Sequence, residues 1–431
     1  NSLPALLIFY FSWQLIIIRS CYNLSMPREL KNHISENIVA DILGISKRNL
    51  SKFRDNLLVN ERNKKGYIHI NLLKDLPQFQ KILNTNWDKE YKTKPDKDYK
   101  LVELFSGAGG LAIGMHKAGF DTVFLNDFDK DSCDTIQRNK NWRVKHDDIS
   151  NLSFKRFKND IDVLSGGFPC QAFSYAGKKG GFADTRGTLF FEFARAVSEC
   201  KPKVILAENV KGLVSHDKGK TLETISNVIN ELGYDLVEPK VLKAIFYQVP
   251  QKRERLFLVG IRKNLKAAHL YKYPDPFHRV MTLKDALKKG ELYDKKVPKS
   301  HGSKYPDSKK RILDMVPPGG YWRDLPEKYQ KEYMGGSFYL GGGKTGMARR
   351  LSWEEPSLTL TCAPAQKQTE RCHPDETRPL TVREYARIQT FPDSWEFMGS
   401  MSSQYKQIGN AVPVKLAYEI GKHFKKILLK K

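Results

Sequence analysis

The stretch Lys100-Leu101-Val102-Glu103-Leu104-Phe105-Ser106-Gly107-Ala108-Gly109-Gly110 decides the fold of this chain. It begins as a short apolar run, breaks into glycines, and is followed by a helical pattern from Leu111 to Ala118. A strand, a glycine turn and a helix in this order are typical of the opening of a doubly wound α/β sheet, in which the helix amino end offers unpaired amides to an anionic group. The stretch therefore predicts a site for a nucleoside-containing cofactor, either a nicotinamide or S-adenosylmethionine.

Apolar runs recur downstream and continue the alternation of strands with helices. They cover residues 122–126, 161–164, 204–207 and 256–261. Asp127 ends the first of these runs, where a carboxylate would bind ribose hydroxyls. A further acidic turn follows at residues 147–149. The pattern predicts an α/β class with the ligand at the carboxyl ends of the strands.

Composition narrows the class of protein. At about 150 residues per domain, 431 residues predict two to three domains. Subtracting 48 acidic from 73 basic side chains leaves a net charge of +25, which makes nucleic acid the first candidate partner, although the excess lysine can also be plain solvated surface. Six cysteines without framework spacing indicate a reduced, cytoplasmic protein. A secreted disulfide domain, a collagen and a disordered chain are excluded.

The first residues are apolar but do not read as a membrane span. The run from Leu3 to Ile18 is shorter than the roughly 20 residues that a span needs, and Ser12 and Gln14 interrupt it. No basic region precedes it and no cleavage site follows, as an export signal would require. We expect no membrane association. Our hypothesis is that residues 1–25 are a non-native or disordered extension of the reading frame and that the working protein starts at Met26.

Residues 26–88 contain a pattern similar to a helix-turn-helix. Within residues 36–53, apolar positions are spaced for two short helices that meet at Gly44. The second helix, over residues 46–54, presents basic and amide side chains suited to phosphates and base edges. A plain helical hairpin is the alternative. Residues 89–99 alternate charged residues with Tyr and Pro and are expected to form a linker.

Three motifs carry the chemistry. Cys170 lies in a Gly-Pro loop, residues 165–171, at the carboxyl end of the expected fourth strand, where a thiolate is placed for nucleophilic attack. A lone cysteine is more often a small buried hydrophobe. Glu208 ends the fifth strand and puts a carboxylate on the same edge, and Arg253 and Arg255 precede another strand.

In this order the motifs resemble a cytosine-5 DNA methyltransferase of the bacterial restriction-modification type. The resemblance rests on the Phe-x-Gly-x-Gly-Gly turn, Pro-Cys-Gln, Glu-Asn-Val, Gln-x-Arg-x-Arg, residues 378–389 with Phe391-Pro392, and the stretch 409–413. It covers roughly residues 100–262 and 376–420 and does not extend to residues 1–99. It implies a Rossmann-like methyltransferase core that uses S-adenosylmethionine on double-stranded DNA. We expect no metal site, because the possible ligands Cys362, Cys372 and His373 lack a paired short spacing.

The resemblance also implies a role for each site residue. Cys170 would add to carbon 6 of cytosine, and a protonated Glu208 would donate to ring nitrogen 3. Arg253 and Arg255 would hold the ring carbonyl and a nearby phosphate; a structural ion pair with Glu254 or another acidic residue is the alternative. The cofactor-binding residues would be Phe105, Gly107, Gly109, Gly110, Asp127, Phe128, Asp148, Ile149 and Asn410.

The resemblance further implies the domain organisation. Residues 100–262 and 376–431 would form the catalytic domain, and residues 263–375 the target-recognition domain, with Lys344, Arg349 and Arg350 as candidate DNA contacts. The target cytosine would be flipped out of the duplex, and residues 174–187 would close over it.

The resemblance leaves partners and alternatives to be tested. We expect a cytoplasmic, nucleoid-associated monomer on DNA that is paired functionally with a restriction endonuclease. An additional or alternative role is DNA-binding transcriptional autoregulation through residues 26–99. RNA methylation is a further alternative, against which the long basic reader region and the extra module argue.

Overall fold

The computed structural model describes residues 99–169, 189–276, 280–290, 292–342 and 344–428, together with short segments between residues 33 and 73. The chain divides into two compact units, one holding residues 1–93 and the other nearly all of residues 94–431. No helix of the described residues is long and apolar enough to cross a bilayer.

The described part of the first unit is small. Two strands, β1 (His33–Ser35) and β2 (Tyr67–His69), pair antiparallel, which the sequence patterns did not indicate. Val39, Ala40 and Leu50 are buried, as a pair of helices would require. The rest of the expected helix-turn-helix, like residues 1–25, lies outside the described residues. The helix-turn-helix therefore stays a prediction.

Seven strands of the second unit form one mixed sheet in the order β5-β4-β3-β6-β7-β10-β8. They are β3 (Tyr99–Leu104), β4 (Phe120–Asp127), β5 (Val144–His146), β6 (Val163–Gly166), β7 (Val204–Val210), β8 (Tyr234–Lys243) and β10 (Glu254–Arg262). Neighbours from β5 to β7 are parallel, whereas β10 runs antiparallel to β7 and to β8. The expected alternation of strands and helices is confirmed; the reversal of β10 was not foreseen, and Tyr99 belongs to β3 rather than to a linker.

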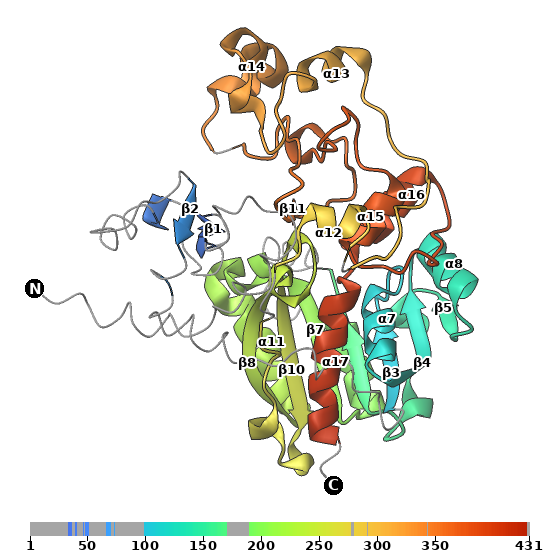
Figure 1. The fold of residues 1–431 in the computed structure, drawn as a ribbon. Coiled ribbons are helices and arrows are strands. Elements are labelled where there is room, and N and C mark those ends of the chain that lie inside the picture. Colours follow the sequence, from blue (N-terminus) through green and yellow to red (C-terminus); the bar gives the residue numbers. More distant parts are fainter. Residues whose placement is uncertain are drawn as a thin grey trace, which may run out of the picture. The chain divides into compact units, whose positions relative to one another are not determined.

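Helices cover both faces of the sheet (Figure 1). They are α7 (Gly110–Lys117), α8 (Lys130–Asn139), α10 (Leu189–Cys200), α11 (Lys220–Glu231) and α17 (Val414–Leu428). On β4, Phe124 packs into one hydrophobic cluster and Leu125 into the other, because successive strand side chains point to opposite faces. Helices α7 and α17 lie side by side: a Cβ atom added to Gly114 would lie 2.4 Å from Cβ of Ala417.

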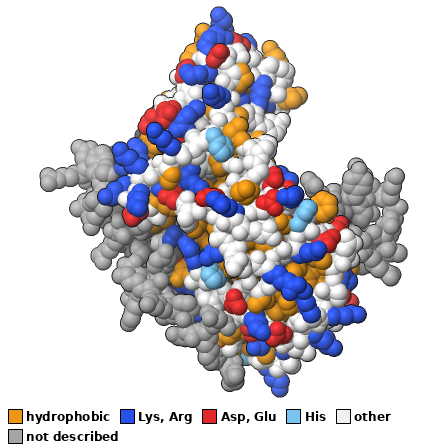
Figure 2. Space-filling view, turned by 90° about the vertical axis from the view of Figure 1, so that its right-hand side faces the viewer, with side chains coloured by type: hydrophobic (Ala, Val, Ile, Leu, Met, Phe, Trp, Pro, Cys, Tyr) orange, Lys and Arg blue, Asp and Glu red, His pale blue; other side chains and the backbone are white. Residues whose placement is uncertain are grey.

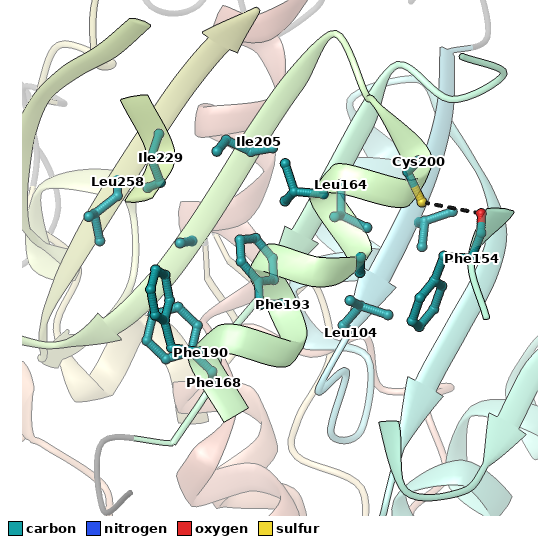
Figure 3. Packing of buried hydrophobic residues seen from close by; sticks show 14 of the residues in the cluster. Leu104, Phe154, Leu164, Phe168, Phe190, Phe193, Cys200, Ile205, Ile229 and Leu258 are labelled. Carbon is teal, nitrogen blue, oxygen red and sulfur yellow. Dashed lines mark hydrogen bonds between the residues drawn. The ribbon is translucent and has the colours of Figure 1, made fainter. Parts of the chain in front are cut away.

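One of these clusters fixes the approach to the predicted nucleophile loop. The ring of Phe168 lies 5.3 Å from that of Phe190 and 5.9 Å from that of Phe193, both on α10 (Figure 3). Nδ2 of Asn209, on β7, donates to the carbonyl of Phe168 at 2.9 Å. The segment that leads into Cys170 is therefore held by both packing and a buried hydrogen bond.

The chain between the motif blocks has a hydrophobic cluster of its own, which includes Leu313, Trp322, Tyr333 and Met334. The helices here are α12 (Leu283–Leu287), α13 (Asp307–Leu313) and α14 (Glu327–Met334). A short parallel pair, β9 (Gln251–Lys252) with β11 (Ser357–Leu358), ties it to the sheet region. The chain then returns through α15 (Val382–Ile388) and α16 (Met401–Asn410) to α17. Within this unit, α13 and α14 lie beyond the carboxyl edge of the parallel strands (Figure 1).

Candidate active site

A cavity of about 900 Å³ opens at the carboxyl edge of the parallel strands. Its wall brings together residues from nearly the whole length of the second unit. Of the predicted site residues, those that line it are Phe105, Gly107, Gly110, Asp127, Phe128, Asp148, Ile149, Glu208, Arg255 and Asn410. Gly109 and Arg253 are not among the lining residues, and Cys170 lies outside the described residues.

The glycine turn after β3 shapes one wall. Phe105 and Gly107 take positive φ values of 56° and 50°, and Gly109, at φ 82°, precedes the first residue of α7. Gly110 has no room for a side chain, because a Cβ atom there would lie 2.4 Å from the carbonyl oxygen of Val412. The turn thus lines the cavity with backbone atoms that no side chain covers. It also lets α7 pack closely against the carboxyl-terminal segment that contains Val412.

Asp127 is oriented by backbone amides. The amide of Asp129 donates to Oδ1 at 2.8 Å and the amide of Gly107 donates to Oδ2 at 2.7 Å. Burial raises the pKa of Asp127, and these two hydrogen bonds oppose that shift. Each carboxylate oxygen can accept more than one hydrogen bond, so the fixed carboxylate can still receive a pair of hydroxyl groups from a ligand.

An exposed aromatic ring follows at the end of the same strand. The Phe128 side chain is 74% exposed, and His146 contacts its backbone carbonyl at 3.1 Å. Asp148 accepts from the amide of Ser150 at 2.8 Å, and Ile149 is buried beside it. A flat apolar face and a rigid acidic turn are therefore presented to the cavity together.

Helix α16 closes the cavity from the far end of the chain. Asn410, its last residue, accepts from the thiol of Cys362 through Oδ1 at 3.2 Å. Nζ of Lys406 lies 2.8 Å from Oδ2 of Asp129, which joins α16 to the start of α8. Lys406 and Asp129 line the cavity, but no motif identified them.

The reversed strand β10 brings a cation to the carboxylate of β7. Because β10 is antiparallel to β7, its amino end lies at the edge where β7 ends, and Arg255 pairs with Val210 in the ladder. Nε of Arg255 lies 2.9 Å from Oε1 of Glu208, with 15% and 11% of the side chains exposed. Burial raises the pKa of Glu208, whereas Arg255 and Arg253 lower it; the net shift is upward.

The backbone before the nucleophile loop approaches Glu208 closely. A Cβ atom on Gly167 would lie 3.0 Å from Oε2 of that carboxylate. Pro169, the residue before Cys170, lines the cavity. A glycine at position 167 thus lets the chain pass over the carboxylate on its way to the nucleophile.

Arg253 is fully buried, and its guanidinium binds backbone carbonyl groups. Its guanidinium donates to the carbonyl oxygens of Leu360 at 3.3 Å, Gly409 at 2.9 Å and Asn410 at 3.3 Å. The alternative was a structural ion pair with Glu254 or another acidic residue. Glu254 is not the partner, since that carboxylate pairs with Lys211 at 2.9 Å. The ion pair of Arg255 with Glu208 fits the second half of that alternative. Arg253 fastens the residues around Asn410 to the sheet edge that carries Glu208.

Glu103 is a site residue that the motif reasoning missed. It is 2% exposed, lines the cavity, and its Oε2 has no hydrogen-bond partner among the described residues. Burial raises its pKa well above the usual range, and Asp127 and Glu208 raise it further. The sequence did contain a signal for Glu103, because an acidic residue stands there inside an apolar run that predicts a strand.

The three basic residues predicted to contact DNA between the motif blocks all contact protein, and Arg350 is the one among them that is buried. Arg350 is 4% exposed and donates to carbonyls that include those of Leu313 and Val316, both at 2.7 Å. Lys344 donates to backbone carbonyls of a neighbouring loop. Burial lowers the pKa of Arg349, whose guanidinium lies 5.7 Å from the ring of Tyr321. For Arg350 the prediction is wrong, because a buried guanidinium needs acceptors and finds them in the backbone.

Comparison with known proteins decides the family. The pattern of the C-5 cytosine-specific DNA methylase family matches residues 99–426. The chain belongs to this family. The type II methyltransferase M.Eco47II of Escherichia coli is 61% identical over 398 residues, which cover 91% of this chain and 95% of that protein. M.PspPI of Psychrobacter sp. (strain TA137) is 57% identical over 397 residues, or 91% of this chain and 95% of that protein.

The fold agrees with that of solved methyltransferases. A crystal structure of a Spodoptera frugiperda DNMT2 protein superposes with a TM-score of 0.55 at 17% identity, covering 76% of this chain and 99% of that chain. The prediction of a type II DNA (cytosine-5-)-methyltransferase of the restriction-modification class is confirmed by the family and by these relatives.

Proposed function

We propose that this methyltransferase transfers a methyl group from S-adenosylmethionine to carbon 5 of a cytosine that is flipped out of a specific double-stranded DNA sequence. The observation that carries the proposal is that one cavity joins Asp127 and Phe128 to Glu208 and Arg255. Residues suited to a nucleoside and residues suited to proton donation thus line the same cavity. Direct transfer of a methyl group from one bound ligand to another requires such an arrangement.

The described residues fit the cofactor. The carboxylate of Asp127, fixed by two amides, suits a ribose diol, and the exposed ring of Phe128 suits stacking on adenine. Asp148 and Ile149 border the same space, and Asn410 closes it. When bound, S-adenosylmethionine supplies an electrophilic methyl group on a sulfonium.

The chain's own residues make the cytosine reactive. The thiolate of Cys170 forms a bond to carbon 6, which moves electron density to carbon 5 and onto the ring. Glu208 in its protonated form donates to nitrogen 3 and neutralises that charge; burial, which raises its pKa, favours this form. After transfer, a base takes the carbon 5 proton, the sulfur leaves as a thiolate, and nitrogen 3 returns its proton to Glu208, which restores both the ring and the enzyme. Arg255 holds Glu208 and lines the cavity beside the base.

DNA would be held outside this cavity. We assign residues 100–262 and 376–431 to the catalytic domain and residues 263–375 to target recognition, which the separate hydrophobic cluster there supports. Lys and Arg side chains are spread over the face of the described residues that Figure 2 shows, consistent with a polyanionic partner. Residues 174–187, which the resemblance implies as a loop over the extruded base, lie outside the described residues.

The biological role follows from the enzyme class. Modification of the recognised sequence would protect it from a cognate restriction endonuclease, with the methyltransferase acting as a monomer on nucleoid DNA. If so, DNA from cells that express the wild type should carry modified cytosines in one sequence, whereas cells that express Cys170→Ala should lack them.

Covalent trapping tests the chemistry. With S-adenosylmethionine present, the wild type should form a denaturation-resistant complex with duplexes that contain 5-fluorocytosine, because fluorine cannot leave as a proton does. Cys170→Ala should form none, and Cys362→Ser, which keeps a donor for Asn410, should trap as the wild type does. A complex of undiminished yield with Cys170→Ala would overturn the assignment of the nucleophile.

A further inference from the structure

Two consecutive apolar side chains stand exposed beyond the carboxyl edge of the sheet. Tyr339 is 79% exposed and Leu340 is 67% exposed. Phe128, at 74%, is the other described hydrophobic residue exposed to this degree, and it is accounted for by the cavity that it lines. Exposed apolar pairs of this kind mark interaction sites more often than scattered single residues do.

Aromatic packing holds the base of this pair. The rings of Trp322 and Phe338 lie 6.0 Å apart, edge to face, and the ring of Tyr339 lies 5.2 Å from that of Phe338. Trp322 is 6% exposed and belongs to the local hydrophobic cluster. A chain of rings therefore runs from the interior outward to Tyr339.

A lysine fixes the backbone of the same loop. The ammonium group of Lys344 donates to the carbonyl oxygens of Ser337 and Leu340. Since these carbonyls face Lys344, the backbone of the loop is held in one conformation. The pair is thus preorganised, which lowers the entropy lost when a partner binds.

Two lysines of the described residues lie near the pair, and each is engaged within the protein. Lys331, whose ammonium lies 5.8 Å from the Phe338 ring, is bound to Glu327 at 2.7 Å. The ammonium group of Lys344 is occupied by the carbonyl oxygens of Ser337 and Leu340. The pair is therefore suited to an apolar contact rather than to a phosphate.

Glycine leaves space on both sides of the pair. A Cβ atom added to Gly336 or Gly341 would meet nothing within 4 Å. The backbone on each side of the pair is therefore open at these two glycines.

We propose that Tyr339 and Leu340 are sequence-reading residues that contact the apolar edges of bases in the DNA substrate. Tyrosine and leucine can contact a thymine methyl group or the carbon edge of a pyrimidine, or insert at a base step. DNA is the occupant that the family supplies, and the net charge of +25 favours a polyanion over a second copy of the same chain. The inference rests on the assignment of residues 263–375 to target recognition.

The test compares two duplexes. The recognised sequence is first read from modified cytosines in the DNA of cells that express the wild type. Affinities are then measured by fluorescence anisotropy for a duplex with that sequence and for one with the same bases shuffled, at several salt concentrations. The variants are Tyr339→Ala with Leu340→Ala, and Met401→Ala as a control that truncates another exposed apolar side chain, 38% exposed on α16.

The double variant should bind the recognised duplex about tenfold more weakly and the shuffled duplex equally well, as loss of a base contact predicts. The slope of log affinity against log salt should stay unchanged, since no phosphate contact is lost. Met401→Ala should match the wild type.

Several outcomes would overturn the proposal: equal losses on both duplexes, a shallower salt slope, or unchanged affinity. A wild-type dimer in sedimentation velocity that the double variant converts to monomer would make the pair an interface between copies instead. Trapping on 5-fluorocytosine by the double variant at saturating DNA shows that the chemistry is intact, so that failure here is distinct from failure of the proposed reaction.

Discussion

Replacing Glu208 with glutamine should abolish the alkaline fall of the methyl-transfer rate. Burial raises the pKa of Glu208, and the proposed role needs the protonated form. In the wild type, once Cys170 is ionised, the active fraction should therefore drop about tenfold for each pH unit above that raised pKa. The amide does not titrate, so Glu208→Gln should show no such drop. The rate of Glu208→Gln should still fall at low pH, because Cys170 must still ionise.

The expected loss of rate in Glu208→Gln follows from the chemistry of the glutamine amide. It cannot give up a full proton to nitrogen 3, and loss of a general acid costs about 10²–10⁴ in rate, or roughly 3–5 kcal/mol of barrier. The side chains of Glu208 and Arg255 are 11% and 15% exposed, so the change also leaves a nearly buried cation without its anion. Stability should therefore fall as well, by less than the roughly 3–5 kcal/mol of a fully broken buried pair, because the amide oxygen still accepts.

The assay is single-turnover transfer of a labelled methyl group at saturating DNA, across a pH series, with thermal unfolding of each variant measured in parallel. Glu254→Gln is the matched control, because that carboxylate lies on the neighbouring strand and pairs with Lys211 at 33% exposure. It should keep the wild-type profile. An unchanged alkaline limb in Glu208→Gln, or a rate within about threefold of the wild type, would refute the role of the protonated carboxyl.

Three further variants probe other parts of the enzyme. Phe128→Ala should weaken S-adenosylmethionine binding by about threefold to tenfold in calorimetry without lowering the unfolding temperature, since its ring is 74% exposed. Gly114→Ala should destabilise the protein by about 1–3 kcal/mol in chemical denaturation, because its Cβ atom would lie 2.4 Å from Cβ of Ala417. Lys309→Met should lower the free energy of unfolding by about 3–5 kcal/mol, because it leaves the fully buried carboxylate of Glu370 without its cation.

Matched changes control the last two variants. Gly290→Ala should be nearly neutral, since the nearest atoms to its Cβ would be 4.0 Å away. Lys310→Met removes an exposed partner of Asp314 and should change stability by less than about 1 kcal/mol. If Lys309→Met and Lys310→Met unfold alike, the buried pair with Glu370 is not a main source of stability. A normal affinity in Phe128→Ala would exclude stacking.

The Lys309 variant also has a pH signature. Burial raises the pKa of Glu370, and Lys309 opposes that shift. With a folded pKa above the unfolded one, the folded state binds more protons, so stability falls as pH rises from the unfolded pKa through the folded pKa. Lys309→Met raises the folded pKa further. Its loss of stability should therefore shrink on acidification, which denaturation at two pH values can check.

Much of the candidate site could be predicted from local sequence. The glycine turn and Asp127 follow directly from a strand end, and a strand end is set by apolar runs and turn residues within a few positions. Phe128 was named only because of the resemblance to the family. Glu208 was found in the same way, at the end of β7. Arg350 was mispredicted because a short basic run does not reveal that its guanidinium lies among carbonyls.

The sequence by itself determined the alternation of strands and helices, the glycine turn and the set of motifs that names the family, because these depend on neighbours along the chain. Only the tertiary structure decided that β10 runs backwards, so that Arg255 meets Glu208, and that Asn410 closes a cavity begun by residues some 300 positions earlier. It also decided that Glu103 is buried, with no hydrogen-bond partner for its Oε2 among the described residues. Ion pairing, burial and pKa are set by segments that are distant in sequence, and only the folded chain brings those segments together.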